Sequence, residues 1–265
     1  MNNMPMEINT PDNARYEVYE DLLVRRDQLY KEAGSYMTVY TAEFGELITS
    51  NFELKIECIK KKKTIGYCQS RINRGIAIDT TLMQAEIEQE MKLYYVQLQD
   101  MISDTEKAKN AECSSEFRFN RSKKLYRRLA KLIHPDINKK TERDETLKDL
   151  WTRIVKAYQI NDADELEDLE VLVRKALEVL GDEGFEPHID DIEERIERVE
   201  RQINEILTTE PYTYGEILGS EEKKNGLRKQ LQAEHDEYEQ YLAELTKTLD
   251  DILREGGASL VWKMN

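Results

Sequence analysis

The sequence predicts an all-α protein made of three consecutive parts, residues 1–110, 111–181 and 182–265. Residues that interrupt helices are scarce, since only 11 Gly and 5 Pro occur among 265 residues. Charged residues make up 35% of the chain, which is typical of helices with long exposed faces. Apolar residues recur at steps of three and four along most of the chain, and this spacing places them on one side of a helix.

Residues 1–110 are predicted to form a helical, coiled-coil-like arm. Its apolar spacing predicts an opening helix that ends near Gly34 and a second helix that continues to about Ile72. Asp79 or Thr80 can cap a third helix, because their side-chain oxygens accept hydrogen bonds from the free amides of a first turn. The third helix carries a regular apolar seam of Ile87, Met91, Tyr94, Leu98 and Met101. We therefore expect the second and third helices to be antiparallel neighbours.

Residues 182–265 are predicted to form an acidic, antiparallel coiled-coil hairpin. One apolar seam consists of Ile189, Ile192, Ile196, Val199, Ile203 and Ile206. Turn-forming residues follow between Thr208 and Ser220, and a second seam consists of Leu227, Leu231, Tyr238, Leu242, Leu245, Leu249 and Ile252. Two seams of similar length joined by a loop are typical of a helical hairpin. The stretch from Asp182 to Gly257 holds 22 acidic and 9 basic residues, so most of the negative charge lies there.

The central part contains a basic amphipathic helix. It begins near Arg121, and no acidic residue occurs before Ile133. Its apolar face is formed by Tyr126, Leu129 and Ile133, and its basic face by Lys124, Arg127, Arg128 and Lys131. Pro135 disfavours helical geometry at the preceding residue, so the helix should end at His134. The tripeptide His134-Pro135-Asp136 is then expected to lie exposed at the end of the helix.

A second amphipathic helix is predicted to begin near Glu145. It places Trp151, Ile154 and Tyr158 on one side, with Leu147, Leu150 and Ala157 nearby. This apolar face can pack against that of the basic helix, which predicts a helical hairpin.

The central part resembles the J-domain (DnaJ) family. Residues 123–136, Lys-Lys-Leu-Tyr-Arg-Arg-Leu-Ala-Lys-Leu-Ile-His-Pro-Asp, look like the second helix and signature loop of that family. The later Trp151-x-x-Ile154-x-x-Ala157-Tyr158 is similar to its third helix. His-Pro-Asp alone arises by chance in many proteins, whereas the tripeptide with both helices in register is a specific signal. The resemblance implies a J-domain within residues 111–181.

The resemblance implies a co-chaperone that docks on a DnaK-type chaperone, of the heat shock protein 70 family, and stimulates its ATPase. On this interpretation His134, Pro135 and Asp136 form the signalling loop, and Asp136 can pair with an arginine of the partner. The docking face would consist of Lys123, Lys124, Arg127, Arg128 and Lys131. Clustered basic residues accelerate encounter with an acidic partner. The arms would bind an unidentified client protein or a partner, or serve as surfaces for a homodimer.

Composition and motifs disfavour other classes. The formal net charge of −15 argues against nucleic acid or anionic membrane as partners. No apolar run approaches the ~20 residues of a membrane span, and residues 1–13 do not resemble a secretory signal. Cys58, Cys68 and Cys113 lack metal-ligand spacing, so we expect no metal, no cofactor and reduced thiols in the cytoplasm. No catalytic motif is recognisable, so no enzymatic activity is expected.

A second interpretation is a coiled-coil scaffold whose J-like hairpin no longer couples to a chaperone. The short first helix usual in the family, with its Tyr-Tyr-x-x-Leu-Gly motif, is missing before Phe117. The usual basic fourth helix is replaced by an acidic one between Asp162 and Leu180. A third interpretation, a nucleic-acid-binding module built on the basic helix, conflicts with the charge of the rest of the chain.

Overall fold

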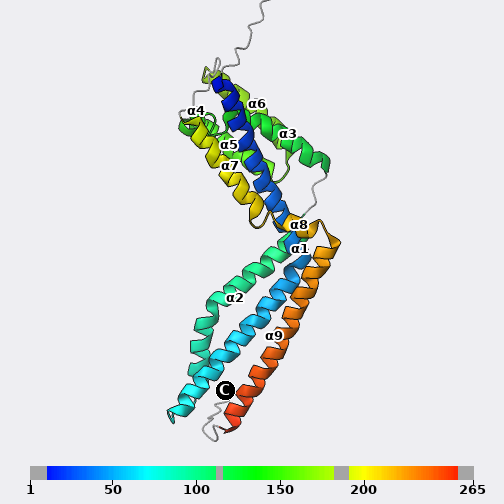
Figure 1. Ribbon diagram of the computed structural model, residues 1–265. Coiled ribbons are helices and arrows are strands. Elements are labelled where there is room, and N and C mark those ends of the chain that lie inside the picture. Colours follow the sequence, from blue (N-terminus) through cyan, green and yellow to red (C-terminus); the bar gives the residue numbers. More distant parts are fainter. Residues whose placement is uncertain (1–10, 112–115, 182–190, 256–265) are drawn as a thin grey trace, which may run out of the picture. The chain divides into compact units, whose positions relative to one another are not determined.

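The computed structural model describes residues 11–111, 116–181 and 191–255, and all the regular elements in these ranges are helices (Figure 1). The all-α prediction is therefore confirmed. The helices are α1 (Pro11–Asn73), α2 (Thr80–Asn110), α3 (Glu116–Ile133), α4 (Lys139–Arg143), α5 (Glu145–Gln159), α6 (Ala163–Val179), α7 (Ile192–Thr208), α8 (Tyr214–Leu218) and α9 (Glu221–Glu255). None of these described helices combines the length and apolar character that crossing a bilayer requires.

Helix α1 runs unbroken through the position where the sequence predicted an end. Gly34 lies inside the helix with open space around its Cα, so neither a positive φ nor a close approach requires glycine there. A glycine costs a helix only about 1 kcal/mol relative to alanine. The buried side chains of Leu29 and Phe44 on either side offset that cost. The predicted break near Gly34 is therefore wrong.

The chain forms two compact units, and α1 contributes to both. The first unit contains residues 1–35 and 112–213, and the second contains residues 36–111 and 214–265. The boundaries of these units differ from the three consecutive parts that composition suggested, because one long helix supplies packing surfaces to segments far apart in the sequence.

A three-helix bundle of α3, α5 and α6 lies at the centre of the first unit. Tyr126, Leu129 and Ile133 of α3 pack in one buried cluster with Leu147, Leu150, Ile154, Ala157 and Tyr158 of α5. The predicted packing of these two helices is therefore confirmed. The acidic helix α6 completes the cluster with Leu166, Leu169 and Val173. The Asp144 side chain accepts a hydrogen bond from the Leu147 amide at 2.9 Å and caps α5, and Asp162 caps α6 in the same way.

The same unit contains a second apolar cluster, in which the beginning of α1 packs along α7. It consists of Tyr19, Leu23 and Leu29 of α1, Ile196, Val199, Ile203 and Ile206 of α7, and Ile137. Arg15 pairs with Glu193 at 2.7 Å, and Arg26 donates to Gln202 at 3.4 Å, so the two helices run parallel.

The second unit is built from the rest of α1 with α2 and α9. Ile56 of α1 packs with Ile87, Met91 and Leu98 of α2, and Lys60 pairs with Glu88 at 3.1 Å. Lys109, near the end of α2, pairs with Glu46, so α1 and α2 are antiparallel as predicted. Asp79 caps α2 by accepting from the Leu82 amide at 3.0 Å.

Helix α9 runs parallel to α1 within the second unit. Glu43 pairs with Arg228, and the Asn51 side chain donates to the Leu231 carbonyl at 2.8 Å. The seam of α7 is filled by α1 in the first unit, so the predicted hairpin between the two C-terminal seams is wrong. An apolar seam requires a partner helix but does not specify which one. Ile189, predicted to begin this seam, lies outside the described residues.

Candidate functional site

The His134-Pro135-Asp136 loop begins where α3 ends. Helix α3 stops at Ile133, as Pro135 predicted, although the His134 amide still donates to the Ala130 carbonyl at 2.9 Å. The His134 carbonyl then accepts from the amides of Ile137 and Asn138 at 2.9 and 2.8 Å. These bonds fold the tripeptide into a tight turn against the end of the helix.

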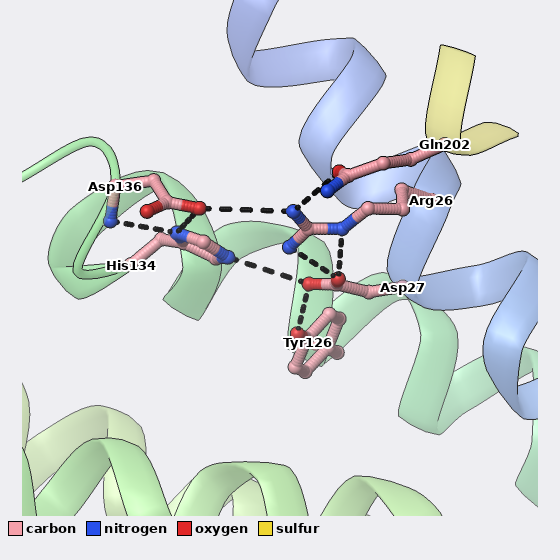
Figure 2. Close-up of polar contacts among 6 residues, drawn as sticks. All are labelled: Arg26, Asp27, Tyr126, His134, Asp136 and Gln202. Carbon is pink, nitrogen blue, oxygen red and sulfur yellow. Dashed lines mark hydrogen bonds and ion pairs between the residues drawn. The ribbon is translucent and has the colours of Figure 1, made fainter. Parts of the chain in front are cut away.

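His134 is buried rather than exposed, which corrects the expectation from the sequence. It is 4% exposed, and its ring lies edge-on to Trp151 with centroids 4.8 Å apart. The Asp136 amide donates to Nδ1 at 3.1 Å, so Nδ1 acts as the acceptor nitrogen. In the neutral ring Nε2 then carries the proton, and it faces Oδ2 of Asp27 at 3.4 Å (Figure 2). Both imidazole nitrogens are engaged.

Asp27 of α1 is the centre of the polar cluster in Figure 2. Its carboxylate accepts from the Tyr126 hydroxyl at 2.7 Å and from Nε and Nη2 of Arg26 at 3.1 and 2.9 Å. Burial of Asp27 opposes ionisation, but hydrogen bonding from His134 and the charge of Arg26 outweigh it and lower the pKa of the carboxyl group. Asp27 is therefore held as a carboxylate beneath the loop.

Arg26 joins the loop to two other helices. Its guanidinium lies 3.7 Å from Oδ2 of Asp136 and donates to the side chain of Gln202 on α7 (Figure 2). Burial disfavours the charged guanidinium, but Asp27 raises the pKa of Arg26 above its usual value. The Asp136 side chain, 38% exposed, already has an arginine partner within the chain.

The basic residues of the predicted docking face on α3 pair with acidic residues of two different helices, α1 and α6. Lys131 donates to Glu20 of α1 at 2.6 Å, and Arg127 pairs with Asp21 of α1 at 2.5 Å. Burial raises the pKa of Glu20, although its hydrogen bond with Lys131 opposes that shift.

On the other side of α3, Arg128 donates to Glu170 of α6 at 2.6 Å. The hydrogen bonds from Arg174 and Arg128 lower the pKa of Glu170. Lys123 and Lys124 form no ion pair with the described residues, and Lys124 is exposed. The five predicted docking residues therefore lie on one helix but do not share one free surface.

The residues of α1 that complete this site were missed by sequence reasoning. Glu20 and Asp27 are seven positions apart, which is close to two helical turns, so both lie on the same side of α1. Two carboxylates at this spacing can pair with the basic residues of another helix. Acidic residues at this spacing are common in a chain with 54 Asp and Glu, so the pattern alone does not identify the site. The partner of such a stripe is determined by tertiary packing across more than 100 residues.

No group of three or more His, Cys, Asp or Glu side chains suited to a metal ion occurs within residues 11–111, 116–181 and 191–255. Cys58 and Cys68 are buried free thiols, and burial raises the pKa of both. Comparison of the chain with models of known protein families, with curated proteins and with solved structures found no match.

Proposed function

We propose that this protein is a J-domain-like co-chaperone that docks on a DnaK-type chaperone and stimulates its ATPase. One observation carries the proposal: a basic helix ends in His134-Pro135-Asp136 and packs through its apolar face on a second helix. The second helix contributes Ile154, Ala157 and Tyr158 to the shared core, at the positions that match the family pattern. The face of α3 opposite this core is cationic, and such a face attracts an acidic surface of a partner.

The proposed chemistry belongs to the partner. The loop would position residues of the chaperone that hydrolyse ATP, and the basic side chains would orient the complex. Lys123 and Lys124 form no ion pair with described residues, so they offer the first encounter surface. Association should weaken as salt screens these charges.

Single-turnover ATP hydrolysis by a DnaK-type chaperone tests the proposal. The wild-type protein should accelerate hydrolysis, and His134→Gln should abolish the acceleration. His235→Gln is the matched control, because it makes the same substitution in the second unit, where His235 lies 3.0 Å from Asn51. Equal far-UV circular dichroism spectra of the three proteins would show that the helices are intact. Failure of the folded wild-type protein to stimulate any of several chaperones would refute the proposal.

A scaffold function is the second candidate, and the burial of His134 favours it. A histidine that is 4% exposed and hydrogen-bonded to Asp27 can serve simply to fasten α1 to the bundle. In that case His134→Gln should lower the stability of the first unit, and no variant should affect a chaperone ATPase. The two candidates therefore differ in the ATPase assay.

A further inference from the structure

One side of α1 covers the surface that the proposed function needs. Glu20, Asp21, Val24 and Asp27 occupy positions i, i+1, i+4 and i+7, which lie along one side of a helix. Glu20 binds Lys131, Asp21 pairs with Arg127, and Asp27 contacts the Tyr126 hydroxyl and His134. Val24, 2% exposed, belongs to the core cluster of the bundle. This side of α1 therefore contacts the basic helix and the tripeptide together.

The contacts made by α1 are of the chemical kind expected from an external partner. Two carboxylates meet two of the five basic docking residues, and a third faces the histidine of the loop. Arg26 meets the loop aspartate, which on the proposed function would pair with an arginine of the chaperone. We propose that residues 20–27 of α1 are an intramolecular occupant of the docking face and must leave it before a chaperone can bind. This inference rests on the proposed function.

The packing of α1 provides a way to open the site without unfolding the helix. Towards α7, α1 buries an apolar seam that includes Tyr19 and Leu23, both 0% exposed. Towards the bundle its contacts are mainly polar: the Asp21–Arg127 pair is about half exposed, whereas the side chains of Glu20 and Asp27 are mostly buried. The exposed pair contributes little net stability because water solvates the separated charges. At the buried contacts, Lys131 and His134 need replacement partners when Glu20 and Asp27 leave. The α1 and α7 helices can therefore stay paired while the polar contacts with α3 are exchanged for those of a partner.

Three contacts keep the covered arrangement dominant. The His134–Asp27 bond is buried, Val24 lies in the bundle core, and Ile137 of the loop packs in the cluster between α1 and α7. A ligand that binds only the uncovered state must offset this closing free energy, so its apparent affinity falls by the fraction of molecules that are open. Variants that weaken the ionic contacts should raise that fraction.

The full-length double variant Glu20→Gln/Asp21→Asn tests the inference. It removes both carboxylate charges and leaves the docking residues of α3 unchanged. The matched control is Glu53→Gln/Glu86→Gln, which changes the net charge equally at two exposed residues of the second unit that form no ion pair with described residues. Asp21→Asn alone is a second variant. Because Asp21 is exposed, this substitution should not disturb folding, so an effect can be assigned to the lost charge.

Two measurements are made at one ionic strength, because salt weakens both the internal and the external contacts. Hydrogen exchange with mass spectrometry reports the opening of residues 125–138. Single-turnover ATPase assays give the concentration of protein that half-saturates a DnaK-type chaperone. We expect the double variant to exchange faster and to half-saturate at about 3- to 10-fold lower concentration, the control to match the wild type, and Asp21→Asn to lie between them.

The outcomes separate the two proposals. If the wild type stimulates the chaperone and the double variant is no better than its control, the inference is overturned and the proposed function stands. If neither the wild type nor the folded variants stimulate ATP hydrolysis, the proposed function is overturned, and the inference falls with it. If the double variant gains affinity while the control does not, α1 acts as the occupant.

Discussion

Replacing Asp27 by Asn tests how strongly the polar cluster beneath the loop stabilises the first unit. Asn has nearly the same shape but offers one acceptor and one donor group in place of two acceptor oxygens. In the structure one carboxylate oxygen meets Arg26, and the other meets Tyr126 and His134. If the NH₂ group turns towards Arg26, it faces a donor. If it turns the other way, it faces Nε2–H of His134 and the Tyr126 hydroxyl, which can accept only by giving up the bond it donates. If His134 moves its proton to Nδ1 to accept from that NH₂, the bond from the Asp136 amide is lost.

The expected cost is about 1 to 3 kcal/mol of unfolding free energy, the range for a charge-assisted hydrogen bond that is lost or left unsatisfied at a mostly buried site. The Asp27 side chain is 17% exposed, so water can replace its partners only in part. With a urea dependence of about 2 kcal/mol per molar, the midpoint should fall by about 0.5 to 1.5 M.

The assay uses Trp151 as the reporter. The chain has two Trp, so Trp262→Phe leaves one, and its ring lies 4.8 Å from His134 and 5.8 Å from Tyr126, measured between centroids. Urea titrations in this background follow the bundle directly. Asp21→Asn is the control, because its pair with Arg127 is exposed and should cost less than about 0.5 kcal/mol.

The pH dependence supplies a second check with a defined sign. The pKa of Asp27 is lowered in the folded protein, so the unfolded chain binds the proton first as the pH falls. The advantage of wild type over Asp27→Asn should be complete above about pH 5 and decrease as the pH falls through the lowered pKa of the folded state. A difference below ~0.3 kcal/mol at pH 7, or one that stays constant down to pH 3, would refute this account of the cluster.

Three further predictions concern packing. Leu166→Ala should lower the unfolding free energy of the first unit by about 2 to 4 kcal/mol, because the Leu166 side chain is fully buried. The same Trp151 titration measures this loss, and a loss under about 1 kcal/mol would contradict the assigned core. Gly45→Ala should lower the melting temperature, because a Cβ there would lie 2.6 Å from Oγ1 of Thr105. Gly66→Ala should instead stabilise α1 by about 0.5 to 1 kcal/mol, because open space surrounds that position. Equal effects of the two substitutions would exclude the close approach at Gly45. Asn51→Ala should cost about 1 to 2 kcal/mol by circular dichroism melting, because the residue is 4% exposed and its amide donates to the Leu231 carbonyl of α9. A neutral effect would argue against that contact.

Local features of the fold followed from the sequence. Pro135 predicted the end of α3, Asp79 predicted the start of α2, and the spacing of Tyr126, Leu129 and Ile133 predicted which side of α3 is buried. Each of these signals acts within a few residues, because a cap, a proline ring and a helical period constrain only neighbouring backbone. For the same reason the sequence located the His134-Pro135-Asp136 loop correctly.

The choice of partners was decided only by the tertiary structure. Glycine at position 34 was compatible with a helix end or with a continuous helix, and packing on both sides selected the continuous one. The seam that includes Ile196 could have met α9 but packs on Tyr19 and Leu23 of α1, since apolar burial rewards any complementary stripe. The pairing of α1 carboxylates with α3, and with it the burial of His134, follows from that choice. The sequence by itself determined the helices and the loop, whereas the packing of α1 decided that His134 of this loop is buried.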